Sequence, residues 1–275
     1  MYERVSRRSV LRAVGAAGAV ALGTAPAAAA SECKGSRTSD DDLPFDTGGR
    51  YGGWGGHEFH GTAPGHDRNP VVFVHGNTRS ACDFSKHADE FLARGYLGDA
   101  LWSISFREGT STHPEMRDQL EGFVANVLAY TGASTVDVVA HSLGVTGARF
   151  WLAETGRYAS VATFVGLAGA NHGTSSCPTC TAYPGTGEPC QFISPLCADE
   201  PGEPLYELNH PDETPHADTT DYYTIRGTAD TFYFDDPDSP RLDGAVRNVV
   251  LEGATHDEVR ESSESIDRQY EWTTT

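Results

Sequence analysis

Lysine is almost absent from this chain of 275 residues. Lys34 and Lys86 are its only lysines, so arginine supplies nearly all of the positive charge, and 39 acidic side chains outnumber 20 basic ones. A surface with a formal net charge of −19 repels polyanions, which argues against nucleic acid or an anionic membrane as a partner. Acidity can serve solubility alone, but together with scarce lysine it favours a halophilic protein, because salt screens self-repulsion.

The chain also lacks a long hydrophobic run. Its longest apolar stretch, Ala13–Ala25, is rich in alanine and glycine and shorter than the roughly 20 residues that span a bilayer. Arg7 and Arg8 precede this stretch, and the small residues Ala27–Ala30 follow it. We therefore predict that residues 1–30 are a twin-arginine signal peptide, and that the mature protein is secreted, extracellular, soluble and monomeric.

Cysteines are few but even in number, and four of them fall between Cys177 and Cys197. In an exported protein this favours disulfide bonds. The CxxC form of Cys177–Cys180 also allows a zinc site, although no second CxxC completes it. The sequence leaves the pairing open among all six candidates: Cys33, Cys82, Cys177, Cys180, Cys190 and Cys197.

Regular alternation of apolar strands and amphipathic helices begins near residue 70. It predicts one α/β domain over residues 70–275, with a mostly parallel sheet covered by helices on both faces. Residues 31–69 are rich in glycine and predict an irregular arm, and residues 171–221 predict an insertion rich in cysteine and proline. The expected strands are Val71–Val74, Ala100–Phe106, Val136–Ala140, Val161–Leu167, Tyr222–Arg226 and Arg247–Leu251; the expected helices are Ser85–Arg94, Glu115–Tyr130, Val145–Glu154 and Glu258–Tyr270.

The segment Val136–Gly144 carries the strongest functional signal. It is typical of a buried strand, a tight turn of the form small-x-Ser-x-Gly, and the start of a helix. Such a turn exposes the serine hydroxyl at the edge of a sheet, while Ala140 and Gly144 leave room for close packing. Ser142 is therefore a candidate nucleophile.

A serine hydroxyl needs a base to take its proton and an acid to orient that base. Four histidines follow Ser142, and His256 is the preferred base because it comes directly after the last expected strand. Asp230 follows the strand Tyr222–Arg226 and is the preferred acid. The other histidines are His172, His210 and His216; the alternative acids are Asp235, Asp236, Asp238, Asp243 and Asp257.

Acyl transfer also needs donors for a developing oxyanion. We expect one to be the backbone N–H of Leu143, directly after the nucleophile, and the other to be that of Asn77, in the glycine-containing loop after Val71–Val74. We expect His75 to support this loop, and His141 to face away from the site.

These segments together resemble the class 2 lipase family, small secreted bacterial lipases. The resemblance covers about residues 69 to 260 and rests on Asn69–Gly76, Val136–Gly144, Leu167–Asn171, Ala229–Asp230, Arg241–Ala245 and Gly253–His256. It implies an α/β-hydrolase fold and hydrolysis of carboxylic esters, with Ser142, Asp230 and His256 as the triad. Val145 replaces a glycine that is common in the family, and the insertion is longer than in compact members.

The residues and the resemblance thus predict a secreted lipase or esterase that needs neither a metal nor an organic cofactor. Two alternatives stay open. The elbow is also similar to that of extracellular polyester depolymerases, which use the same chemistry. A catalytically inactive binding protein of the same fold is the second alternative, against which the ordered triad argues.

Overall fold

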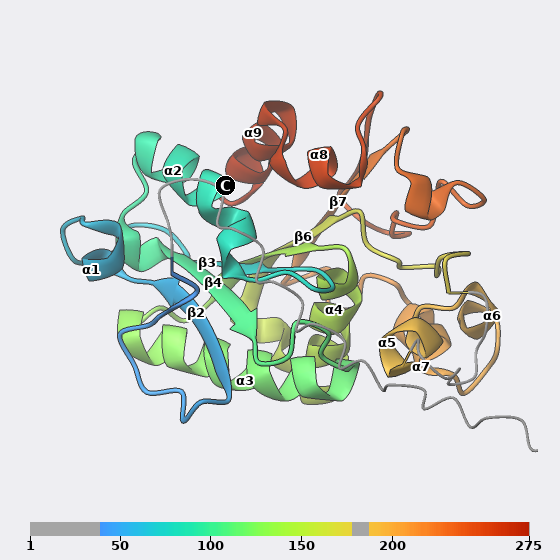
Figure 1. The fold of residues 1–275 in the computed structure, drawn as a ribbon, viewed down its shortest axis with the longest axis horizontal. Coiled ribbons are helices and arrows are strands. Elements are labelled where there is room, and N and C mark those ends of the chain that lie inside the picture. The colour runs from blue at the N-terminus through green and yellow to red at the C-terminus, as the bar shows by residue number, and fades with distance from the viewer. Residues whose placement is uncertain (1–38, 178–186, 275) are drawn as a thin grey trace, which may run out of the picture.

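The computed structural model describes residues 39–177 and 187–274, so the expected signal peptide, Cys33 and Cys180 lie outside the described residues. The centre of the fold is an eight-stranded sheet in the order β1-β2-β4-β3-β5-β6-β7-β8 (Figure 1). Strands β3 to β8 run parallel, and β2 is antiparallel to β4. The strands are β1 (Asp41–Asp42), β2 (Tyr51–Gly55), β3 (Val71–Val74), β4 (Leu101–Phe106), β5 (Val136–His141), β6 (Val161–Leu167), β7 (Asp221–Gly227) and β8 (Arg247–Leu251).

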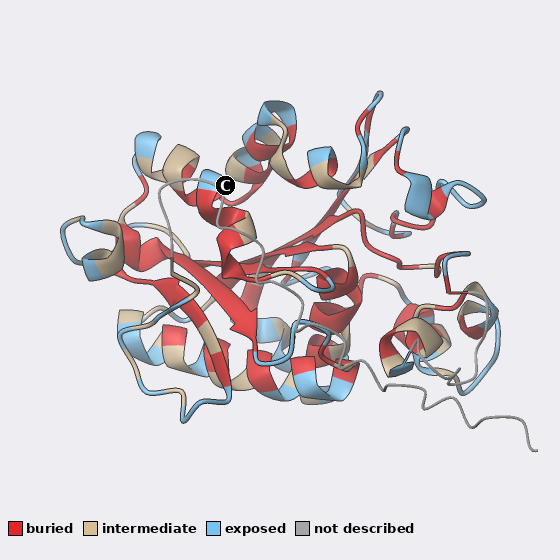
Figure 2. Ribbon diagram, viewed as in Figure 1, coloured by how far each residue is buried: buried red, intermediate tan, exposed pale blue. Residues whose placement is uncertain are grey.

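Helices cover both faces of this sheet, which confirms the predicted fold class. One core cluster joins α3 and α4 to one face, and a second joins α2, α8 and α9 to the other (Figure 1). The central strands are buried along their whole length, as Figure 2 shows, because side chains on both of their faces meet helices. The helices are α1 (His57–His60), α2 (Ser85–Ala93), α3 (His113–Thr131), α4 (Leu143–Thr155), α5 (Gly187–Phe192), α6 (Pro195–Ala198), α7 (Pro204–Asn209), α8 (His256–Glu261) and α9 (Ser263–Trp272).

The N-terminal arm is not irregular throughout, which corrects the prediction for residues 31–69. Its glycine-rich centre forms β2, which pairs with β4 over five residues. Gly53 has a φ of 133°, and a Cβ there would collide with the carbonyl oxygen of Ser103. Glycine thus permits this strand to lie close to β4, although the residue type itself disfavours strands.

The C-terminal segment forms two helices, where the sequence predicted one over Glu258–Tyr270. Ser262 interrupts the helix with an extended conformation (φ −66°, ψ 149°), and its hydroxyl accepts a hydrogen bond from the N–H of Ser265. This capping contact starts α9 in a new direction. The break matters because α8 carries His256 at its first residue.

The insertion contains the short helices α5, α6 and α7, which gather beside the body of the fold (Figure 1). Cys177 and Cys190 form a disulfide bond, which removes both as thiolate ligands and decides against a four-cysteine zinc site. Cys82 and Cys197 each take part in a disulfide bond as well, but not with one another. Among the described helices, none has the length and apolar character needed to cross a bilayer.

Candidate active site

Ser142 occupies a strained turn between β5 and α4. Its φ of 55° and ψ of −128° are unusual for a residue with a side chain, and its N–H donates to the carbonyl of Leu167 at 2.9 Å. A Cβ on Gly144 would collide with the carbonyl oxygen of His75, and one on Gly76 would come within 2.8 Å of the Ser142 Cβ. The small residues predicted from the sequence therefore permit the close packing around the turn.

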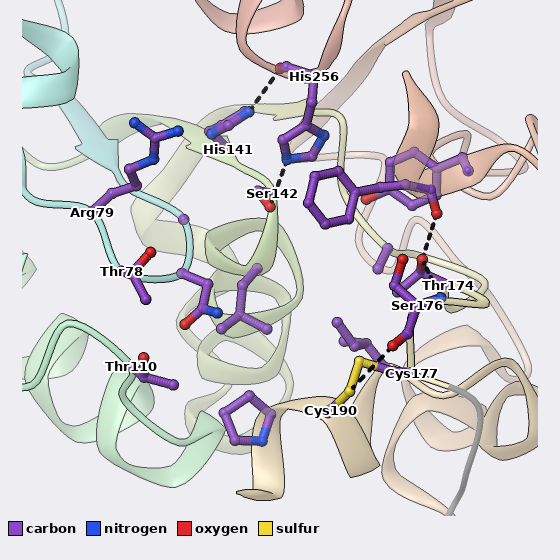
Figure 3. Close-up of a pocket in the computed structure, with 18 of the residues that line it drawn as sticks. Thr78, Arg79, Thr110, His141, Ser142, Thr174, Ser176, Cys177, Cys190 and His256 are labelled. Atoms are coloured by element: carbon purple, nitrogen blue, oxygen red, sulfur yellow. Dashed lines mark hydrogen bonds between the residues drawn. A yellow bond between two sulfur atoms is a disulfide. The ribbon is translucent and has the colours of Figure 1, made fainter. Parts of the chain in front are cut away.

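The three side chains predicted as a triad form one hydrogen-bonded chain. His256 Nε2 lies 2.9 Å from Ser142 Oγ (Figure 3), and His256 Nδ1 lies 2.7 Å from Asp230 Oδ2. The Asp230 side chain is 1% exposed, and its Oδ1 accepts a hydrogen bond from the N–H of Phe232 at 3.0 Å. The buried carboxylate is thus fixed by the backbone on one side and directed at the imidazole on the other.

Strand ends bring these residues together from distant parts of the sequence. Ser142 directly follows β5, Asp230 follows β7, and His256 follows β8 at the start of α8. Thr255 and Glu258 form a capping box at the start of that helix, in which the N–H of Thr255 donates to Glu258 Oε2 at 2.9 Å. The carboxyl ends of parallel strands meet at one edge of a sheet, where α/β folds place their ligand sites.

The two residues expected to supply the oxyanion donors, Asn77 and Leu143, both line the cavity that contains Ser142. Leu143 is the first residue of α4, which begins two residues before the predicted helix, so its N–H has no partner within the helix. Asn77 follows His75 and Gly76 in the loop after β3. His75 supports this loop as expected: Nδ1 contacts the carbonyl of Gly76 at 2.7 Å, and Nε2 accepts from the N–H of Phe106 at 3.0 Å.

Burial keeps His75 neutral. It lowers the pKa of the imidazole to about 4, and the charge of Arg79 adds to the effect, although the bond to Gly76 opposes it. A neutral ring can donate through one nitrogen and accept through the other, which is what the two backbone contacts require.

The cavity beside Ser142 has a volume of about 480 Å³. Leu143, Ile193 and Phe232 give it apolar walls, and the disulfide Cys177–Cys190 borders it on the side of the insertion (Figure 3). The insertion therefore borders the cavity that contains Ser142. Clefts of this size with apolar walls and few polar groups are typical of sites for small organic molecules.

The alternative acids predicted from the sequence do not contact His256. Asp235, Asp236 and Asp238 are exposed, and so is Asp243. Asp257 Oδ1 instead contacts Arg79 Nη2 at 3.0 Å. This ion pair joins the loop that carries Asn77 to the helix that carries His256.

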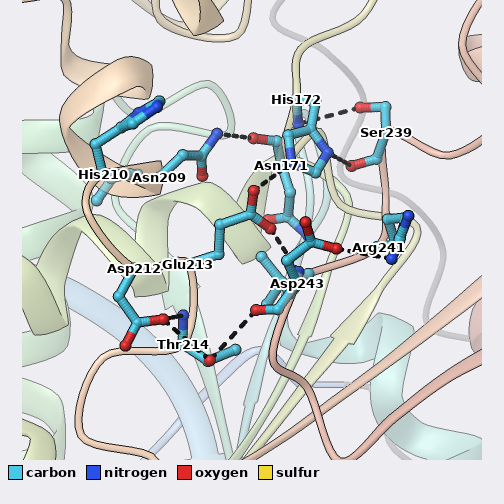
Figure 4. A network of polar contacts seen from close by, with 12 residues as sticks. Asn171, His172, Asn209, His210, Asp212, Glu213, Thr214, Ser239, Arg241 and Asp243 are labelled. Carbon is cyan, nitrogen blue, oxygen red and sulfur yellow. Dashed lines mark hydrogen bonds and ion pairs between the residues drawn. The ribbon is translucent and has the colours of Figure 1, made fainter.

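The remaining histidines lie away from this cavity. His172 Nε2 contacts Glu213 Oε1 at 2.9 Å within a polar network that also holds Asn171 and Ser239 (Figure 4). His210 stacks on Tyr206, and His216 stacks on Tyr158. Across residues 39–177 and 187–274, no group of three or more His, Cys, Asp or Glu side chains is arranged to hold a metal ion.

His141 was expected to face away from the site, and this expectation is wrong. Its Nε2 lies 3.1 Å from the carbonyl oxygen of His256, and the two rings are 4.8 Å apart between centroids (Figure 3). No sequence pattern signals this contact, because it depends on where α8 packs, 115 residues later in the chain.

The parallel sheet, the strained serine turn and the helices on both faces define an α/β-hydrolase. Residues 68–269 match the model of the family Lipase (class 2), so the chain belongs to the class 2 lipases, a family of ester hydrolases. The resemblance seen in the sequence is thereby confirmed.

Solved structures share this fold at low sequence identity. Mature lipase BlEst2 from Bacillus licheniformis is 16% identical with a TM-score of 0.57, covering 74% of this chain and 92% of that one. A gene product from Listeria innocua is 15% identical with a TM-score of 0.53, covering 75% and 94%. Lipase B from Aspergillus fumigatus is 13% identical with a TM-score of 0.55, covering 76% of this chain and 53% of its own.

Proposed function

We propose that the protein is an exported serine carboxylic-ester hydrolase of the lipase or esterase type. The observation that carries this proposal is the position of the His256 ring, within hydrogen-bond distance of both Ser142 Oγ and the buried carboxylate of Asp230. Nucleophile, base and orienting acid in such contact are the arrangement that activates a serine hydroxyl.

In the first half-reaction, Ser142 Oγ attacks the ester carbonyl carbon while its proton passes to His256 Nε2. Asp230 accepts the hydrogen bond from Nδ1–H and stabilises the imidazolium. The backbone N–H groups of Asn77 and Leu143 donate to the oxyanion of the tetrahedral intermediate. The C–O bond of the leaving alcohol then breaks, and His256 returns the proton to the alcohol oxygen.

In the second half-reaction, water attacks the acyl-enzyme and gives its proton to His256. The bond between the acyl carbon and Ser142 Oγ breaks, Oγ recovers a proton, and the carboxylic acid leaves. Every proton is carried by a side chain of this chain, and the reaction consumes only the ester and water.

Neutral esters fit the surroundings of this site better than anionic ones. The apolar walls from Leu143, Ile193 and Phe232 suit an acyl chain, and the net charge of −19 disfavours an anionic substrate. Export through residues 1–30 places the hydrolysis outside the cell, where disulfide bonds such as Cys177–Cys190 persist.

Covalent labelling tests the nucleophile. We expect a fluorophosphonate to add one phosphonyl group, which peptide mass spectrometry locates on Ser142. Ser176 is the matched control because it is an exposed serine on the wall of the same cavity. Ser142→Ala should abolish labelling and Ser176→Ala should retain it. Labelling of another residue, or of folded Ser142→Ala at the normal rate, would contradict the proposal.

A further inference from the structure

His141 lies behind the proposed base. It is the last residue of β5 and the neighbour of Ser142, and it is buried, with 2% of its surface exposed. Nε2 lies 3.1 Å from the carbonyl oxygen of His256, and the two rings meet at 49° with their centroids 4.8 Å apart. The same residue thus adjoins the nucleophile through the chain and the base through space (Figure 3).

The chemistry of the contact fixes the protonation of His141. Burial holds its pKa well below the usual value. His256, whenever its imidazole is protonated, acts in the same direction, as do Arg260 from α8 and Arg79 from the loop after β3, and together they outweigh the bond to the His256 carbonyl. Asp257, also on α8, balances both arginines through its contacts with them. A neutral imidazole facing a carbonyl must carry its hydrogen on Nε2, because a carbonyl only accepts.

The other nitrogen of the ring supports the same assignment. His141 Nδ1 is buried and has no hydrogen-bond partner within the described part of the chain. A protonated Nδ1 would leave a donor unsatisfied there, which costs more than an unpaired acceptor lone pair in the same place. His141 therefore donates a hydrogen bond from Nε2–H to the backbone carbonyl of His256, while its Nδ1 carries no hydrogen.

We infer that His141 is a positioning residue for His256, an inference that rests on the proposed function. Asp230 and Ser142 hold the edge of the His256 ring, while His141 holds its backbone and packs against it. Three supports fix an imidazole that must keep its geometry while a proton passes to and from Nε2. A neutral support also avoids a second positive charge beside the imidazolium that forms during the reaction.

Three substitutions of His141 separate the effect of the hydrogen bond from that of simply filling the space. His141→Gln places an amide nitrogen close to the position of Nε2, whereas His141→Asn places it close to that of Nδ1. We expect His141→Gln to keep most of the activity on a soluble nitrophenyl ester. We expect His141→Asn and His141→Phe to lower kcat by about 10- to 100-fold, since the base is misplaced, with KM changed by less than about twofold.

His87 provides a matched control. It is also buried and neutral, and its Nε2 lies 2.9 Å from the carbonyl oxygen of Arg260 on the same helix, α8. His87→Phe removes a comparable contact without touching His256. It should destabilise the protein as much as His141→Phe while leaving kcat close to that of the wild type.

The inference fails if folded His141→Asn and His141→Phe keep kcat within about twofold of the wild type, or if His141→Gln loses as much as His141→Asn. If these variants do not fold, a measurement on the unmodified protein still tests the inference. Nitrogen NMR should show His141 as a neutral ring with its hydrogen on Nε2 from about pH 5 to pH 8. Titration of the His141 ring in this pH range, or a hydrogen on its Nδ1, would overturn the inference. Failure of the proposed function shows separately, as hydrolysis by Ser142→Ala.

Discussion

At the scale of single residues, the proposed chemistry depends on how Asp230 orients His256. The carboxylate contacts Nδ1 at 2.7 Å, so Nε2 keeps its lone pair toward Ser142. Asp230→Asn keeps the shape but presents an amide that favours the wrong tautomer of the imidazole. We expect kcat to fall by roughly 10³- to 10⁴-fold with little change in stability.

Asp235→Asn is the control for this experiment, because Asp235 is an exposed acid of the same loop. It should leave kcat unchanged in the same ester assay. Retention of full activity by folded Asp230→Asn would show that another group orients the base.

The sequence could predict Ser142, Asp230 and His256 because their order along the chain and their places after strands are local signals. The structure brings these three side chains into contact, while their catalytic roles stay a prediction. The contact of His141 could not be predicted. A histidine before the nucleophile has no sequence pattern that tells whether its ring meets α8 or the core.

At the scale of elements, a partly buried ion pair links the loop after β6 to the segment after α7. His172 Nε2 contacts Glu213 Oε1 at 2.9 Å (Figure 4). Burial lowers the pKa of His172 and Arg149 adds to this, but Glu213 and the Ser239 carbonyl outweigh both and raise it. Burial raises the pKa of Glu213, whereas His172 and the N–H of Asp243 lower it overall.

The signs of these shifts define a pH window. The stability that His172 contributes to the fold is complete below its ordinary pKa of about 6.5, and it is lost as the pH rises through the raised pKa of the folded state. That of Glu213 is present above its ordinary pKa and is lost as the pH falls through the lowered one. The pair therefore stabilises the fold most in mildly acidic solution.

We expect the Tm of the wild type to fall between about pH 6 and pH 8 more steeply than that of His172→Gln, as measured by thermal unfolding. His210→Gln is the control, because His210 stacks on Tyr206 and forms no ion pair with a carboxylate of the described residues. If Tm falls equally steeply with pH in the wild type and in His172→Gln, the pair His172–Glu213 is not the source of the pH dependence.

Among the elements, those with apolar runs were predicted most accurately. Val161–Leu167 and Arg247–Leu251 agree with β6 and β8 at both ends. Strand β2 was missed because glycine has low strand propensity, and its place is decided by close approach to β4. The break at Ser262 was missed because the apolar pattern continues across it, and only the capping contact ends α8.

At the scale of the whole molecule, the excess of acidic side chains sets the response to salt. A net charge of −19 makes the folded chain repel itself, and added salt shortens the reach of that repulsion from about 10 Å at 0.1 M to about 3 Å at 1 M. We propose that the protein is adapted to high salt. Its Tm should rise between about 0.1 M and 1 M KCl.

Differential scanning calorimetry in KCl and in an equal osmolality of sucrose distinguishes screening from general exclusion of solute. A rise in KCl that exceeds the rise in sucrose supports the adaptation, and a Tm that is flat or falls in KCl contradicts it. The arrangement of strands is no evidence for or against adaptation to salt, because surface charge and fold are largely independent of each other.

The measurement that tests the central claim most directly is hydrolysis of a short-chain nitrophenyl ester by purified Ser142→Ala. The variant removes only the hydroxyl oxygen that lies 2.9 Å from His256 Nε2, so the fold should be retained. The account predicts that ester cleavage drops by at least about 10³-fold while circular dichroism and Tm stay unchanged. Near-normal turnover by this folded variant would contradict it.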